Sequence, residues 1–260
     1  MNQHLTYIHP EARVASNVTI EPFAVIQKNV EVGEGTWIGS NAVIMDGARI
    51  GKNCQIFPGA VISAPPQDLK YKGEPSTVVI GDNTTIREFV TLNRGTELDK
   101  NATVIGDNCL LMAYVHVAHD CTIGNNVIIV NSVQLAGHIE EQDWAFIGGA
   151  SAVHQFVKIG AHAFVSGGSL VRKDVPPFIK AGREPLSYCG INTVGLRRRG
   201  FSSDKINEIQ EIYRHVYLKG LNNADALDLI VSEMPATKER DEVLHFIRSS
   251  ERGIMRGSLE

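Results

Sequence analysis

The chain has 260 residues, of which 43% are apolar and 21% charged, so it can bury a substantial core and is not disordered in composition. The net charge of −4 argues against general nucleic-acid binding, and no apolar run is long enough for a membrane-spanning helix. The N-terminal stretch lacks the basic start and apolar segment of a secretory signal. We therefore expect a cytoplasmic protein whose four cysteines are free thiols.

Aliphatic residues recur every six positions from the beginning of the chain. The recurrence is unbroken over ten positions from Ile8 to Ile62, resumes over residues 80–92, and continues from Ile105 to Val171 after a shift of one residue. Only Glu141 breaks it. A period of six fits neither an α-helix nor simple strand alternation, but it fits a parallel β-helix whose short strands meet at tight turns.

Three such hexads would close one triangular coil, so residues 18 apart should stack at about the 4.8 Å spacing of neighbouring strands. The residue four positions after each aliphatic residue is small or β-branched and would also point inward. This pattern predicts that Cys54, Cys109 and Cys121 lie in the core. Glycine often follows the aliphatic residue, and we expect these glycines to provide unusual backbone angles at the turns: Gly33, Gly39, Gly51, Gly81, Gly106, Gly124, Gly148 and Gly160.

The repeat is interrupted at residues 63–77 and 93–103, which must leave the prism as loops and are either binding segments or plain surface loops. It ends near residues 174–177, and helical spacing follows. We predict a β-helix domain over residues 1–189 and a helical domain over residues 190–260 that caps the coil. Its helices are expected to begin at Ser202 or Ser203, at Asn222 and at Asp241, with Gly220 ending the first.

Histidines gather in three successive coils of the predicted β-helix. His116, His119, His138 and His154 lie there, and none occupies an inward position. Asp120 and His138 are 18 residues apart, so the coil predicts that these groups share one outer edge. Imidazoles beside an acid are typical of general-base chemistry or of metal ligation, although each histidine alone would be an ordinary surface residue.

Two further polar segments are candidates for binding. The first loop carries Gln67, Asp68 and Lys70, which either reach a substrate on a neighbouring subunit or are simply solvated. Residues 197–199 are three consecutive arginines, which suit a phosphate or an acidic partner but could equally form a solvated face. The sequence has no Gly-x-Ser-x-Gly elbow and no phosphate-binding glycine-rich loop, which disfavours a serine nucleophile and ATP chemistry.

Several motifs together resemble a known family. They are QDLKY at 67–71, HVAHDC at 116–121, AGH at 136–138, IGG at 147–149, VHQF at 153–156, DVPP at 174–177 and RRGF at 198–201. The chain is similar, over nearly its whole length, to the acyl-carrier-protein-dependent UDP-N-acetylglucosamine O-acyltransferases that begin lipid A synthesis. Hexads alone would indicate only the broader acyltransferase superfamily, whereas the histidine motifs are specific.

The resemblance implies a left-handed parallel β-helix of hexapeptide repeats with a C-terminal α-helical domain. It implies transfer of a 3-hydroxyacyl chain from acyl carrier protein to the 3-hydroxyl of UDP-N-acetylglucosamine. His119 matches the general base, Asp120 the residue that assists it, and Gly137 the donor of a backbone N–H to the oxyanion. The residues that match substrate-positioning groups are Gln67, Asp68, Lys70, His116, His138, His154, Gln155, Gly167, Asn192, Arg198 and Arg199.

Among these, Asn192, Arg198 and Arg199 match contacts to the nucleotide, and Gly167 matches the position that limits acyl length. Family members are homotrimers with active sites between subunits. They need neither metal nor nucleotide cofactor, and their acyl donor is carried on the phosphopantetheine of acyl carrier protein.

A related N-acyltransferase fits less well, because the repeats already begin at Ile8. Two other hypotheses are a γ-type carbonic anhydrase with zinc on His116 and His119, and a non-catalytic scaffold.

Overall fold

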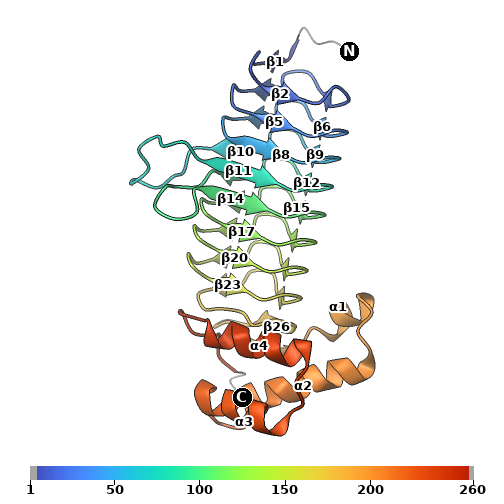
Figure 1. Cartoon of the computed structure of the whole chain (residues 1–260), viewed down its shortest axis with the longest axis vertical. Coiled ribbons are helices and arrows are strands. Elements are labelled where there is room, and N and C mark those ends of the chain that lie inside the picture. The colour runs from blue at the N-terminus through green and yellow to red at the C-terminus, as the bar shows by residue number, and fades with distance from the viewer. Residues whose placement is uncertain (1–4, 258–260) are drawn as a thin grey trace.

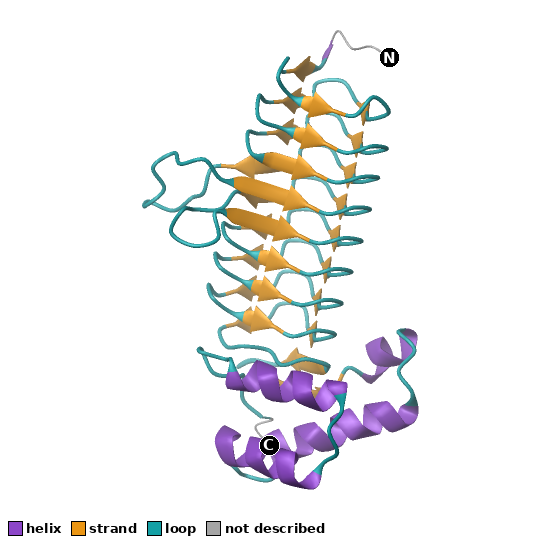
Figure 2. Cartoon of the chain, viewed as in Figure 1, coloured by secondary structure: helices purple, strands orange, loops and turns teal. Residues whose placement is uncertain are grey.

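In the computed structural model, which describes residues 5–257, the chain forms a long three-sided coil with helices at its C-terminal end (Figure 1). Successive short strands belong in turn to three sheets, called A, B and C here (Figure 2). Residues 18 apart pair in register, as Ile8 does with Ile26 and Val117 with Leu135. The left-handed parallel β-helix expected from the sequence is confirmed.

The strands of each sheet follow one another along the coil. Sheet A contains β1 (Tyr7–Ile8), β4 (Val25–Ile26), β7 (Val43–Ile44), β10 (Val61–Ala64), β13 (Thr91–Asn93), β16 (His116–Val117), β19 (Gln134–Leu135), β22 (Ala152–Val153) and β25 (Leu170–Val171). Sheet B contains β2 (Arg13–Val14), β5 (Glu31–Val32), β8 (Ala48–Ile50), β11 (Thr77–Ile80), β14 (Ala102–Ile105), β17 (Thr122–Ile123), β20 (Glu140–Glu141) and β23 (Lys158–Ile159). Sheet C contains β3 (Thr19–Ile20), β6 (Trp37–Ile38), β9 (Gln55–Ile56), β12 (Thr85–Ile86), β15 (Leu110–Leu111), β18 (Ile128–Ile129), β21 (Phe146–Ile147), β24 (Phe164–Val165), β26 (Ile179–Gly182) and β27 (Ser187–Ile191).

The core is a column of aliphatic side chains that point inward from the strands of the coil, with Glu141 of β20 as an exception. The small residues expected to share this column do so, and Cys54, Cys109 and Cys121 are buried. Glu141 occupies an inward position with only 2% of its surface exposed, and neither carboxyl oxygen has a hydrogen-bond partner. Burial raises the pKa of Glu141 to about 8.

The expectation about the turn glycines is wrong. None of the eight predicted glycines has a positive φ; that conformation occurs two residues later, as at Asn41 and Asn53. The glycines are needed for space instead, because the backbones of successive coils approach closely there. A Cβ on Gly33 would lie 2.7 Å from the carbonyl carbon of Gly51, closer than atoms can pack.

Three corners join the sheets, and each is named here by the sheets it connects in chain order. The AB corner includes residues 118–121 and 136–139, the BC corner residues 142–145 and 160–163, and the CA corner residues 148–151 and 166–169. Both predicted loops leave from the AB corner, with residues 65–76 between β10 and β11 and residues 94–101 between β13 and β14. They project beside each other from one edge of the coil (Figure 2).

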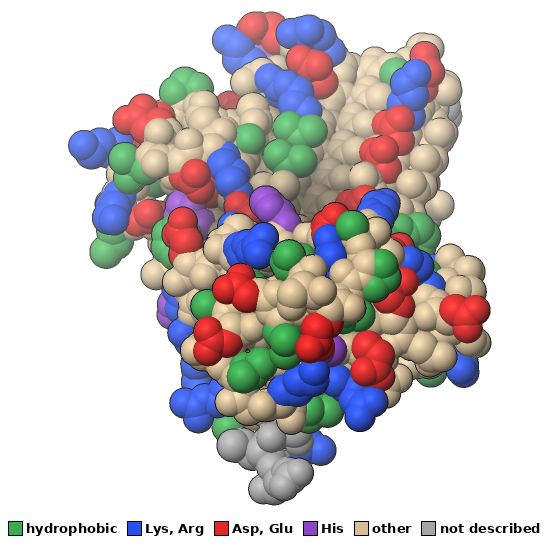
Figure 3. Space-filling view, turned by 60° about the horizontal axis from the view of Figure 1, so that its bottom comes forward, with side chains coloured by type: hydrophobic (Ala, Val, Ile, Leu, Met, Phe, Trp, Pro, Cys, Tyr) green, Lys and Arg blue, Asp and Glu red, His purple; other side chains and the backbone are tan. Residues whose placement is uncertain are grey.

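The last strands form an antiparallel hairpin, and the domain boundary predicted between residues 189 and 190 falls within its second strand, β27. The helices that follow are α1 (Thr193–Arg198), α2 (Ser203–Leu218), α3 (Asn223–Glu233) and α4 (Lys238–Arg248). They lie across the C-terminal end of the coil, and Figure 3 shows basic and acidic side chains interspersed over the face they present. None of the helices in residues 5–257 has the length and apolarity that a membrane span requires.

Two of the three predicted helix starts are confirmed, since Ser202 caps α2 and Asn222 caps α3. The third is wrong: α4 begins at Lys238, because the Thr237 side chain accepts a hydrogen bond from the Arg240 backbone N–H and caps the helix earlier than Asp241. The short helix α1, which holds two of the three consecutive arginines, was not predicted.

Candidate active site

A histidine and a buried carboxylate form the centre of the site at the AB corner. Nδ1 of His119 lies 2.9 Å from Oδ2 of Asp120. Asp120 is fully buried and also accepts hydrogen bonds from the Thr96 backbone N–H at 3.0 Å and from the Thr96 hydroxyl at 2.7 Å. Burial alone would raise the pKa of Asp120, but the hydrogen bonds from Thr96 and His119 outweigh it and lower the pKa.

The local backbone explains why this pair can form. Asp120 has a φ of 60°, the left-handed conformation that the corner turn requires and that aspartate tolerates better than most residues. An ionised carboxylate only accepts hydrogen bonds, so the proton of the contact lies on Nδ1 of His119. In the neutral ring Nε2 then carries the free lone pair, which is the state a general base needs.

The next coil toward the C-terminus supplies the other residues around His119. His138 makes an edge contact with the His119 ring at 4.9 Å between centroids, and its other face stacks on Phe156 at 4.4 Å. Gly137 packs directly on His119: a Cβ there would lie 2.8 Å from Cε1 and 3.0 Å from Nε2. Gly137 is buried, and within the described residues its N–H donates no hydrogen bond.

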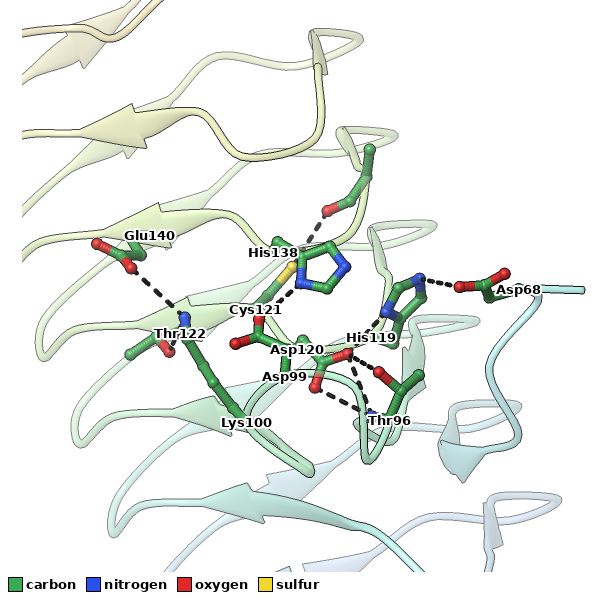
Figure 4. Close-up of polar contacts among 11 residues, drawn as sticks. Asp68, Thr96, Asp99, Lys100, His119, Asp120, Cys121, Thr122, His138 and Glu140 are labelled. Carbon is green, nitrogen blue, oxygen red and sulfur yellow. Dashed lines mark hydrogen bonds and ion pairs between the residues drawn. The ribbon is translucent and has the colours of Figure 1, made fainter. Parts of the chain in front are cut away.

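The 65–76 loop brings a second carboxylate to the base. Oδ1 of Asp68 accepts from the Lys70 backbone N–H at 2.9 Å, and Oδ2 lies 4.0 Å from Nε2 of His119 (Figure 4). That separation is too long for a direct hydrogen bond and leaves the lone pair of Nε2 unoccupied. Gln67 and Lys70 are exposed on the same loop.

A cleft of about 800 Å³ opens beside these groups, a size typical of small-molecule sites. Asp68, Lys70, His138 and Phe156 line one part, and the C-terminal Arg252 lines another. The cleft thus runs from the two loops of the AB corner to the segment that follows the last helix.

The remaining predicted histidines lie close by in the coil but differ in position. His154 and Gln155 are exposed at the AB corner, one coil above Gly137. His116 does not share that edge: it is part of strand β16, where its Nδ1 lies 2.7 Å from the Thr91 hydroxyl and burial lowers its pKa. The reason is its place in the hexad, since it directly precedes the inward Val117.

The predicted nucleotide contacts lie at the BC corner. The Asn192 amide donates to the His162 carbonyl at 2.9 Å and caps α1 by accepting from the Gly195 N–H. The Arg199 guanidinium lies over the Trp144 ring at 5.2 Å. Burial, together with the positive charge of Arg199, lowers the pKa of His162 to about 4. Arg198 is exposed at the end of the same helix.

Gly167 lies at the third corner, CA, and is exposed. One chain therefore does not bring the three predicted groups together: the base and its partners, the nucleotide contacts and the acyl-length position occupy three different corners. The six-residue period explains this separation, because positions that differ by six or twelve residues along a coil fall on different corners.

Sequence reasoning missed three residues of the centre. Thr96 and Asp99 come from the 94–101 loop, and Phe156 was noticed only as part of a motif. The signal for the first two was present: this loop follows a sheet A strand, so it leaves the coil at the corner that holds His119.

The comparisons first define a class of protein. A family model of bacterial transferase hexapeptide repeats matches residues 29–64 and 102–137, in agreement with a β-helix that carries a histidine–carboxylate pair at its corner. The chain is thus a hexapeptide-repeat transferase. A second model, described as UDP N-acetylglucosamine O-acyltransferase, domain 2, matches residues 174–255.

Individual relatives narrow the class. An acyl-[acyl-carrier-protein]–UDP-N-acetylglucosamine O-acyltransferase of Burkholderia lata is 47% identical over 195 residues, 74% of either chain. Among solved structures, a UDP-N-acetylglucosamine acyltransferase from Bacteroides fragilis is 51% identical, with a TM-score of 0.96 over 98% of this chain and 100% of the other. Another, from Francisella novicida, is 42% identical, with a TM-score of 0.94 over 97% and 92%.

The chain belongs to the family of acyl-carrier-protein-dependent UDP-N-acetylglucosamine O-acyltransferases. The comparisons thus favour the acyltransferase interpretation over the carbonic anhydrase hypothesis.

Proposed function

We propose that the protein transfers a 3-hydroxyacyl chain from acyl carrier protein to the 3-hydroxyl of UDP-N-acetylglucosamine, the first step of lipid A synthesis, with His119 as general base. The family relationship supports the reaction, and one observation carries the mechanism. Asp120 is buried, ionised and bonded to Nδ1 of His119, which leaves Nε2 free at 4.0 Å from Oδ2 of Asp68, a residue that lines the cleft.

In the proposed reaction, Nε2 of His119 takes the proton of the sugar 3-hydroxyl as that oxygen forms a bond to the thioester carbonyl carbon. The carbonyl π electrons move to the oxygen, and the Gly137 N–H donates a hydrogen bond to the resulting oxyanion. When the intermediate collapses, the carbon–sulfur bond breaks, and the phosphopantetheine thiolate takes the proton from Nε2. Asp120 stabilises the imidazolium that exists between these two steps.

We propose a homotrimer as the functional unit. The groups expected to bind one substrate molecule lie at three corners of a single chain, His119 at AB, Arg199 at BC and Gly167 at CA. In a three-fold ring the two surfaces that meet are different ones, so a cleft between neighbouring chains can combine groups that lie on different corners of a single chain.

We also propose that the reaction needs neither metal nor nucleotide cofactor. The acyl group arrives as an activated thioester on phosphopantetheine, and this chain supplies both the base and the oxyanion donor. Atoms of His119, Asp120 and His138 lie within 4.8 Å of one another, as metal ligands would, but Nδ1 of both imidazoles already contacts a carboxylate. The cytoplasm is the expected compartment, since all four cysteines are free and three are buried as thiols.

The test is acyl transfer from 3-hydroxyacyl carrier protein to UDP-N-acetylglucosamine by the purified protein, with the product followed by mass spectrometry. His119→Ala should reduce the rate by at least about 10³-fold, because base and imidazolium are both lost. His245→Ala, which removes an exposed histidine on α4, serves as the matched control and should leave the rate unchanged. Full activity of His119→Ala would remove the mechanism, and no transfer by the wild-type protein would remove the function.

A further inference from the structure

The 94–101 loop is held in a defined shape by its own backbone. The Asp99 N–H donates to the Thr96 carbonyl at 3.3 Å, and the Asn101 N–H donates to the same oxygen at 2.9 Å. Thr96 is buried, with its backbone N–H and its hydroxyl bonded to Asp120. The loop is therefore anchored at the catalytic corner, and this anchoring sets the place of the next carboxylate along it.

That carboxylate belongs to Asp99, and it contacts the second histidine of the centre. Oδ2 of Asp99 lies 2.6 Å from Nδ1 of His138, a residue 39 positions later in the chain. His138 has only 16% of its side chain exposed, whereas the Asp99 carboxylate is 36% exposed at the edge of the cleft. The site thus contains two carboxylate–imidazole pairs, and one loop contributes to both.

The surroundings of His138 leave little freedom to its ring. One face stacks on Phe156, and the edge contact with His119 limits the other direction. With Nδ1 bonded to Asp99, Nε2 lies on the side of the ring that faces His119 (Figure 4). Because an ionised carboxylate only accepts hydrogen bonds, this contact places a proton on Nδ1, and in the neutral ring Nε2 then presents a lone pair next to the reacting groups.

We propose that Asp99 is a positioning residue: it holds His138 as the Nδ1–H tautomer, so that Nε2 accepts a hydrogen bond from a hydroxyl group of the bound substrate. This inference rests on the proposed function, whose acceptor sugar and 3-hydroxyacyl chain both carry hydroxyl donors. Without Asp99, the Nδ1 proton loses its acceptor. The proton would then be free to move to Nε2, and a ring protonated at Nε2 cannot accept a hydrogen bond there.

The first test needs no substrate. The two ring nitrogens of His138 are followed by ¹⁵N NMR in histidine-labelled protein, with His138→Ala assigning the signals. Wild-type protein should show the proton on Nδ1, and Asp99→Ala should move it to Nε2 or average it over both nitrogens. A wild-type His138 protonated only on Nε2 would overturn the proposal, whether or not the protein proves to be an acyltransferase.

The second test is kinetic. Asp99→Ala should lower kcat/KM by on the order of tenfold in the wild-type background and by less than about twofold in His138→Ala, because the carboxylate acts through that ring. Glu97→Ala, which removes an exposed carboxylate two residues earlier in the loop, is the matched control. Equal effects of Asp99→Ala in both backgrounds would show that the residue does not act through His138.

Comparing two acyl donors, with and without the 3-hydroxyl, identifies which substrate supplies the hydroxyl that His138 binds. If the hydroxyl belongs to the acyl chain, an acyl carrier protein donor without the 3-hydroxyl should abolish the penalty of Asp99→Ala. If it belongs to the sugar, the penalty should persist with both donors. Thermal melting of each variant at the wild-type temperature checks that the fold is intact.

Discussion

The close packing of Gly137 on the catalytic ring allows one prediction to be worked out from the structure. In Gly137→Ala, the new Cβ would lie 2.8 Å from Cε1 of His119, whereas carbon atoms pack at about 3.5–4.0 Å. The ring must therefore move by roughly 1 Å or lose its contact with Asp120. A displacement of about 1 Å at a catalytic group costs on the order of 10² in rate, so we expect kcat to fall about 100-fold.

This substitution isolates the position of the base. The backbone of Gly137 has no positive φ, so alanine causes no backbone strain, and the N–H proposed for the oxyanion remains. Acyl transfer is measured under single-turnover conditions for the wild type, for Gly137→Ala, and for Gly137→Ala combined with His119→Ala. In the double variant the clash is gone, so alanine at 137 should add no further loss. A Gly137→Ala rate within about threefold of wild type would refute the reasoning.

The remaining predictions concern pH and metal. Burial raises the pKa of Glu141 to about 8 from 4.5, so the folded protein keeps a proton that the unfolded chain releases, and stability falls as the pH rises between these values. Glu141→Val should therefore raise the melting temperature at pH 8 and flatten its decline from pH 5, as measured by thermal unfolding; parallel pH profiles of variant and wild type would contradict this. Prolonged dialysis against a chelator should leave acyl transfer unchanged, whereas activity that is lost on dialysis and restored by zinc would favour a metal site on His119, Asp120 and His138.

Much of the fold could be predicted because the β-helix repeats. Each inward aliphatic residue has its neighbour 18 positions away, so pairs such as Ile26 and Ile44 follow from counting. The helix caps Ser202 and Asn222 were also readable, since capping depends on residues within one turn. The prediction of unusual backbone angles at the turn glycines was wrong, because the local sequence looks the same whether glycine is needed for its backbone angles or for the close approach of the next coil.

Part of the site could also be predicted from the 18-residue length of each coil. His119 and Gly137 occupy equivalent places in successive coils, and so do Asp120 and His138, so counting brings these residues to one corner. His116 shows that histidines close in sequence need not share a corner. It precedes His119 by three residues and therefore lies in strand β16 of sheet A instead of at the AB corner.

By itself, the sequence determined the coil, its inward residues and the corner at which His119 and His138 meet, because a strict period converts spacing along the chain into position in space. The repeat also places the start of the 94–101 loop at that corner, but only the tertiary structure decided that Thr96 contacts Asp120 and that Asp99 contacts His138. The loop has no period, so its path depends on its own turn and on the carboxylate that anchors it. The tertiary structure also showed that Arg199 and Gly167 face away from the base within one chain, which follows from the three-sided cross-section.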